Sequence, residues 1–215
     1  GTLCSTVPPI SPTAWTTFAT GVNPGRHGVY DFVRFKPGTR ERVPVPAGQH
    51  NRATLWDLFS RAGRRVVILD VPFTHPPQPV NGVMISGYGT PRGEDTVYTH
   101  PPDLPRRLED AGLPIGLGWP EERMEVRPDY VEDWERVMAG RVELGDHFMA
   151  QDWNLFMIVF GATDTLAHNF WHYLEPTHPA SRTTQAPDYR EALFRGYELC
   201  DDMLGRLMAQ AGPDC

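Results

Sequence analysis

The chain has 215 residues, of which 40% are hydrophobic and 22% are charged, which is the composition of an ordinary globular protein. This length can bury one sizeable core, so we predict a single domain over residues 1–215. The net charge of −7 argues against binding to nucleic-acid polymers, because such binding needs a basic face. The longest apolar run, residues 155–162, is too short to cross a bilayer.

Residues 8–28 contain a predicted short helix with a serine at its start. We expect the helix over residues 12–20, because Pro12 suits a first helical position and Gly21 suits the left-handed residue that follows a helix. Ser11 is then the N-cap, whose hydroxyl accepts a hydrogen bond from a backbone N–H of the first turn. The alternative is a phosphate site at Ser11, because free N–H groups and the helix dipole favour a bound anion there.

Basic residues outnumber acidic ones in the first fifty residues, although the whole chain is acidic. They are Arg26, Arg34, Lys36, Arg40 and Arg42. Such a segment either helps to hold an anionic substrate or is a solvated surface. We predict loop-rich insertions near the site over residues 34–53 and 88–129, the second of which contains two of the chain's three proline clusters.

Predicted helices and strands alternate along the rest of the chain. Apolar spacing and glycine stops predict helices over residues 54–62, 104–111, 130–151 and 189–211. Short runs of branched and aromatic residues predict buried strands over residues 65–71 and 82–86, and a central strand over residues 155–160. This alternation predicts an α/β layered fold with a largely parallel sheet.

Asp164 and His168 follow the predicted central strand. Ligands of α/β folds bind beyond the carboxyl ends of the strands, and a separation of four residues puts both side chains on one face of a helix. A carboxylate and an imidazole together suit Zn²⁺ or a similar divalent cation. The alternative is that Asp164 only caps the helix and that His168 is a packed or exposed histidine.

Two segments resemble the type I phosphodiesterase and nucleotide pyrophosphatase family, a branch of the alkaline phosphatase superfamily. Residues 8–32 are similar to its nucleophile region, which has a Thr or Ser, a helix with an aromatic residue, Thr-Gly, and then Pro and His-Gly; Ser11 falls on the nucleophile. Residues 160–168 resemble its Asp-x-x-x-His metal site. The resemblance implies an alkaline-phosphatase-like α/β/α fold, here incomplete at both ends.

The resemblance implies metal-dependent hydrolysis of phosphodiester or nucleotide pyrophosphate bonds through a covalent phosphoseryl intermediate. Two divalent cations are expected, with Zn²⁺ preferred and Mn²⁺ as the other candidate. Ser11, Asp164 and His168 are the expected metal ligands, and Ser11 is also the expected nucleophile. The expected substrate is a small phosphoester, not a nucleic-acid polymer.

One position departs from the family pattern. Many nucleotide pyrophosphatases have an Asn about 21 residues after the nucleophile that binds a phosphate oxygen, and the equivalent residue here is Phe32. We expect Arg34 or a loop residue to replace it, or the substrate to be oriented differently. The family's Asp-Gly pair before the nucleophile and its later Asp-His-Gly segment are not in the sequence, so we expect the chain to be a piece of a longer enzyme.

Two other functions stay open. One is a phosphomonoesterase or related hydrolase of the same superfamily. A sulfatase is disfavoured, because sulfatases need the pattern Cys/Ser-x-Pro/Ala-x-Arg and the segment that begins at Ser11 lacks its arginine. The other is a noncatalytic module that binds an anion or a partner. Three cysteines with no disulfide-type spacing favour a reducing, cytoplasmic compartment, although the sequence does not determine localisation.

Overall fold

The structure is a computed structural model that describes residues 2–46, 50, 52–120, 129–175, 177–179, 188–213 and 215. The chain divides into two compact units. One comprises Gly1–Arg107 and Asp152–Val159, and the other comprises Leu108–Gln151 and Phe160–Cys215. The single catalytic domain, with insertions over residues 34–53 and 88–129, stays a prediction.

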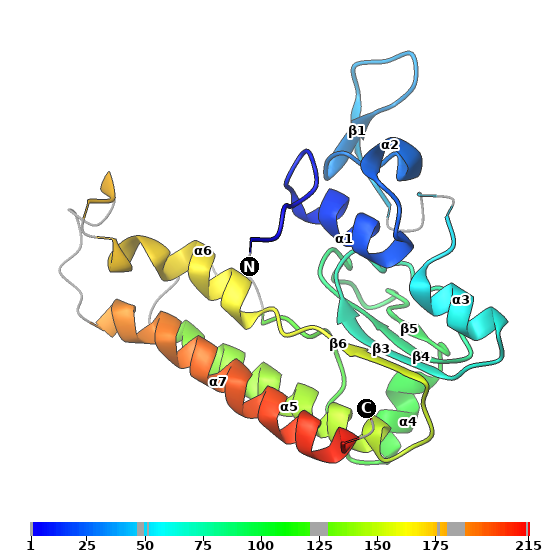
Figure 1. Cartoon of the computed structure of the whole chain (residues 1–215), viewed down its shortest axis with the longest axis vertical. Coiled ribbons are helices and arrows are strands. Elements are labelled where there is room, and N and C mark those ends of the chain that lie inside the picture. The colour runs from blue at the N-terminus through cyan, green and yellow to red at the C-terminus, as the bar shows by residue number, and fades with distance from the viewer. Residues whose placement is uncertain are drawn as a thin grey trace. The chain divides into compact units, whose positions relative to one another are not determined.

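The first unit contains a four-stranded, mostly parallel sheet, as the sequence predicts (Figure 1). Its strand order is β5 (Thr99–His100), β4 (Gly82–Ser86), β3 (Val66–Val71) and β6 (Leu155–Ile158). The central strand, β3, is parallel to both β4 and β6, whereas β5 is antiparallel to β4. The fold is therefore of the layered α/β class.

The prediction that residues 155–160 form a central strand is wrong for the described part of the sheet. There β6 pairs only with β3, and its four residues are half-buried, whereas all six residues of β3 are buried. A continuous apolar run indicates that both faces of a strand are covered, but it does not indicate whether the strand has a neighbour on one edge or on both. The sequence pattern is thus the same for a central and an outer strand.

One face of this sheet is covered by α1 (Ser11–Thr20) and α3 (Leu55–Arg61). Ala19 of α1 and Trp56 of α3 pack with Val66, Ile68 and Met84, which are buried residues of β3 and β4. Val66 and Ile68 are two residues apart, so they point to the same face of the sheet. This packing fixes α1, and with it the backbone that carries Ser11.

Short elements between α1 and α3 were not predicted. They are α2 (Pro24–His27) and the antiparallel hairpin of β1 (Val33–Phe35) and β2 (Arg42–Pro44). Elements of three or four residues are too short to show a hydrophobic period. The longer predicted helices and strands of this unit are confirmed within a few residues of their expected ends.

The described part of the second unit contains three long helices, α5 (Tyr130–Met149), α6 (Ala162–Leu174) and α7 (Asp188–Ala211). Trp134 and Met138 of α5 pack with Leu166 and Phe170 of α6 and with Leu193 of α7 in one apolar cluster. Figure 1 shows α5 and α7 side by side, and two ion pairs join them, Glu135 with Arg195 and Asp146 with Arg206 (2.8 Å). The remaining helix is α4 (Leu104–Asp110), as predicted.

Among the described residues, no helix combines the length and the apolar character that crossing a membrane requires.

Candidate active site

Ser11 is the first residue of α1, and the prediction that it is the N-cap is wrong by one position. The N-cap is Ile10, whose carbonyl accepts the Ala14 N–H (2.9 Å), and no side chain caps the helix. Pro12 prefers an extended residue before it, but Ser11 already lies in the helix. The Ser11 side chain is exposed and makes no hydrogen bond with a described residue. Its hydroxyl is therefore accessible and is not used as a cap.

The end of α1 is held firmly. Gly21 follows the helix with φ 66°, as predicted, and donates its N–H to the carbonyl of Thr17 (2.8 Å). His27 of α2 is buried: its Nδ1 accepts the Val29 N–H (3.1 Å), so its Nε2 carries the proton and donates to Thr17 Oγ1 (2.9 Å). Burial lowers the pKa of His27, and His50 adds to this effect. A neutral imidazole therefore joins α1 to α2.

Arg34 lies on the β1–β2 hairpin, where it is opposite Val43 and exposed. Phe32, which precedes this hairpin, has its ring 5.5 Å from that of Phe73, and Phe73 lies 6.0 Å from Tyr88. An aromatic group thus occupies the position where the family pattern has Asn. The role of Arg34 in substrate binding stays a prediction.

The loops that follow β3 and β4 are joined by hydrogen bonds at the carboxyl ends of the strands. The Thr74 hydroxyl donates to the Val71 carbonyl (2.7 Å) and accepts the Gly87 N–H (3.2 Å), and Ser86 donates to the Thr74 carbonyl (3.2 Å). Asp70 is buried and has a backbone φ of 57°, an angle that residues other than glycine rarely adopt. This end of the sheet, where α/β folds bind ligands, is therefore tightly organised.

Asp164 and His168 lie in the second unit, on one face of α6, as predicted. The N-cap of α6 is Gly161 and no side chain caps it, so the alternative in which Asp164 is the N-cap is wrong. The Asp164 and His168 side chains are 77% and 79% exposed, and Asp164 Oδ1 lies 3.7 Å from His168 Nε2. Zn²⁺ binds such atoms at about 2.0–2.2 Å, so one cation fits between them.

The described residues contain no group of three or more His, Cys, Asp or Glu side chains that could hold a metal ion. His172, one turn beyond His168, instead has its ring 3.9 Å from Tyr173 and 5.7 Å from His178. Ser11 and Arg34 belong to the first unit, and Asp164 and His168 belong to the second. The pair on α6 is thus the part of the predicted site that the structure brings together.

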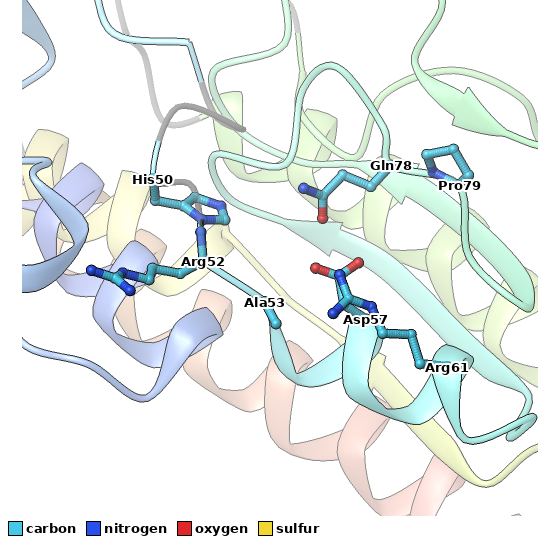
Figure 2. Close-up of a pocket in the computed structure, with 7 residues that line it drawn as sticks. All are labelled: His50, Arg52, Ala53, Asp57, Arg61, Gln78 and Pro79. Atoms are coloured by element: carbon cyan, nitrogen blue, oxygen red, sulfur yellow. Dashed lines mark hydrogen bonds between the residues drawn. The ribbon is translucent and has the colours of Figure 1, made fainter.

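The structure also contains a polar pocket of about 490 Å³ that the sequence did not predict. It lies between the segment before α3, α3 itself and the loop that precedes β4, and it is lined by His50, Arg52, Asp57, Arg61 and Gln78 (Figure 2). Of these residues, only Asp57 has a recognisable sequence pattern around it. It follows Thr54 by three residues, which is the spacing of a capping box, and the two residues form one at the start of α3.

The comparison with protein families agrees with the family resemblance of the sequence. The sequence pattern of the family described as type I phosphodiesterase / nucleotide pyrophosphatase matches residues 1–215. No curated protein matches the chain. Because the family match covers the whole chain, this protein belongs to the type I phosphodiesterase / nucleotide pyrophosphatase family and is a hydrolase of that type.

Proposed function

We propose that the protein hydrolyses phosphodiester or nucleotide pyrophosphate bonds with Ser11 as the nucleophile and with Asp164 and His168 as ligands of a divalent cation. The exposed Ser11 hydroxyl at the start of α1, which forms no hydrogen bond with a described residue, carries the proposal, together with the family match. An alternative role as a cap would require a hydrogen bond that Ser11 does not make. The substrate is a small phosphoester.

When bound, divalent cations would supply positive charge that favours the serine alkoxide and the charge on the phosphoryl oxygens. Zn²⁺ suits the oxygen and nitrogen of Asp164 and His168, and Mn²⁺ is the other candidate. The mechanism requires the Ser11 oxygen to reach the phosphorus atom while these two side chains hold one cation.

In the first step the Ser11 oxygen attacks phosphorus in line, the bond to the leaving alcohol or phosphate breaks, and the serine proton passes to solvent. Thr13, the first residue after Pro12 with an N–H, lies within the first turn of α1, where this donor has no partner within the helix. Such N–H groups stabilise negative charge at a helix start. Water then cleaves the phosphoseryl bond and restores Ser11.

Replacing Ser11 with Ala in the complete protein tests the nucleophile. We expect turnover of bis-nitrophenyl phosphate with Zn²⁺ or Mn²⁺ to fall by at least about a thousandfold, because removing a nucleophile removes the covalent route. Ser11→Thr should keep substantial activity, since a threonine supplies the same hydroxyl. Ser5→Ala is the matched control, because Ser5 is also exposed near the start of the chain.

Undiminished turnover in Ser11→Ala would remove Ser11 from the nucleophile role. Mass spectrometry of acid-quenched protein gives a second readout: after one nitrophenol leaves bis-nitrophenyl phosphate, the peptide that contains Ser11 carries one added nitrophenyl phosphoryl group. Running the assay with nitrophenyl phosphate alongside separates a phosphodiesterase from a phosphomonoesterase.

Replacing the α6 pair tests the metal site independently of turnover. We expect Asp164→Asn or His168→Gln to lower the affinity for Zn²⁺ by at least about tenfold, because each change removes one of the bonds to the cation. Zinc retained after dialysis of the complete protein is the measurement, and Asp201→Asn, an exposed carboxylate of α7, is the control. Equal zinc retention in all of these proteins would place the metal elsewhere.

A further inference from the structure

The polar pocket beside α3 has hydrogen-bond donors that no described residue uses. His50 is only 9% exposed, and its Nδ1 accepts the Arg52 backbone N–H (3.3 Å), so the proton is on Nε2. This Nε2–H has no hydrogen-bond partner among the described residues. A ligand that accepts from this N–H gains a hydrogen bond for which no described side chain competes. The imidazole is neutral at pH 7, because burial lowers the pKa of His50.

Gln78 and Arg61 provide further donors. The Gln78 Oε1 accepts the Trp56 Nε1–H (3.1 Å), which fixes the amide and leaves its NH₂ group without a described partner. Arg61 forms no ion pair with a described residue. Figure 2 shows the Gln78 amide and the Asp57 carboxylate extending toward the same space, with the His50 ring at its side.

The charges of the pocket favour an anion. Arg52 and Arg61 contribute two positive charges and Asp57 one negative charge. Asp57 Oδ2 already accepts the Thr54 N–H (2.9 Å) in the capping box, and Arg52 Nε donates to the Arg26 carbonyl (3.2 Å). Side chains that are already anchored lose little conformational freedom when a ligand binds.

The size of the pocket sets the size of the ligand. Its volume of about 490 Å³ is within the range of small-molecule sites. His50 and Gln78 also line a narrower recess of about 10 Å³, whose walls include Trp56 and Met84 and which holds no more than about one water. The body of a ligand therefore stays in the outer, polar space.

We propose that this pocket binds a small compound through an oxyanion, which accepts hydrogen bonds from His50 Nε2, the Arg61 guanidinium and the Gln78 amide. The second oxygen of Asp57, Oδ1, accepts from a hydroxyl or amino group of the same compound. Ser11 is not among the residues that line this pocket, so the proposal does not rest on the proposed hydrolysis.

The test uses the complete protein with Ser11→Ala, which removes the proposed nucleophile, and with ¹⁵N-labelled histidine. Inorganic phosphate and acetate are titrated separately at pH 7.5 while the His50 ring resonance is followed, after its assignment by His50→Gln. We expect a saturable shift. Saturation by phosphate alone identifies a phosphate group as the anchor, and saturation by acetate alone identifies a carboxylate.

Arg61→Gln should weaken the binding by at least about fivefold, because it removes a charged donor. Arg64→Gln, at another exposed arginine that does not line the pocket, should change the affinity by less than about twofold. Unshifted resonances of the other histidines show that both variants are folded. The proposal is overturned if neither anion saturates the His50 shift, or if both variants weaken binding equally.

Discussion

His27 shows how one side chain can report on the packing around it. It is 4% exposed, and both ring nitrogens are used, one by the Val29 N–H and the other by the Thr17 hydroxyl. A second proton would have to displace the Val29 bond and place a charge in a buried position. His50 nearby would add repulsion if it were also protonated. The folded protein therefore binds this proton less readily than the unfolded chain does.

We expect the free energy of unfolding to fall as the pH is lowered below 6.5, the ordinary pKa of histidine. The unfolded chain takes up the proton near that pH, whereas the folded state, with its lowered pKa, does not, so stability is complete above 6.5 and is lost below it. Urea unfolding at pH 7.5, 6.0 and 5.0 measures this. The His27→Gln protein should show a flatter dependence, and an unchanged dependence would contradict the assignment.

Two glycines, one after a strand and one inside a helix, differ in whether the structure has room for a side chain in their place. Gly87, just after β4, lies so close to the Asp70 and Val71 carbonyls that a Cβ would collide with backbone. Gly205, in the middle of α7, has open space where a Cβ would go and no unusual backbone angle. The first glycine is required by the close approach of the backbone at Asp70 and Val71, whereas the second only weakens a helix.

Gly205→Ala should therefore stabilise the protein by about 0.5–1 kcal/mol, because alanine restricts the unfolded chain and favours the helix. Gly87→Ala should destabilise it by about 1–3 kcal/mol or more, because the collision is with backbone that cannot turn away. Thermal and urea unfolding of both variants check these signs. A stabilising effect of Gly87→Ala would show that the approach of the two loops is looser than described.

At the scale of the whole molecule, the first unit is discontinuous in sequence. Its sheet needs β6, which follows α5 in the chain, and Leu155, Met157 and Val159 pack against the core cluster of Trp56, Val66 and Ile68. Full burial of such a side chain contributes about 1.5–3 kcal/mol, so these three half-buried side chains contribute less each, but the net stability of a domain is only about 5–15 kcal/mol. Residues 1–107 alone therefore lack a large share of their stabilisation.

We expect residues 1–107 expressed alone to lack a cooperative unfolding transition, because the edge of β3 and the part of the core that β6 covers are exposed. The same piece with residues 152–159 attached through a flexible Gly/Ser linker should regain one. The two pieces are compared by circular dichroism during thermal unfolding, and the dispersion of their amide chemical shifts in NMR spectra is a second readout. Cooperative unfolding of both pieces would show that β6 is dispensable.

Local patterns determined much of this protein. The period of apolar residues and the glycine and proline stops predicted the long helices and the parallel strands, and the spacing of Asp164 and His168 placed them on one helix face. The start of α1 was predicted to within one residue. These features depend on residues that are near one another in the chain, so the sequence contains what decides them.

Contacts between distant residues decided the rest. The central position of β3, the burial and tautomer of His27, and the pocket that brings His50 together with Gln78 all depend on segments tens of residues apart. The period of apolar residues does not predict such contacts, because it describes one helix or strand and not the elements that pack against it. The sequence by itself therefore determined the elements and the candidate residues, and only the tertiary structure decided which side chains meet, since burial and hydrogen bonding are properties of the packed chain.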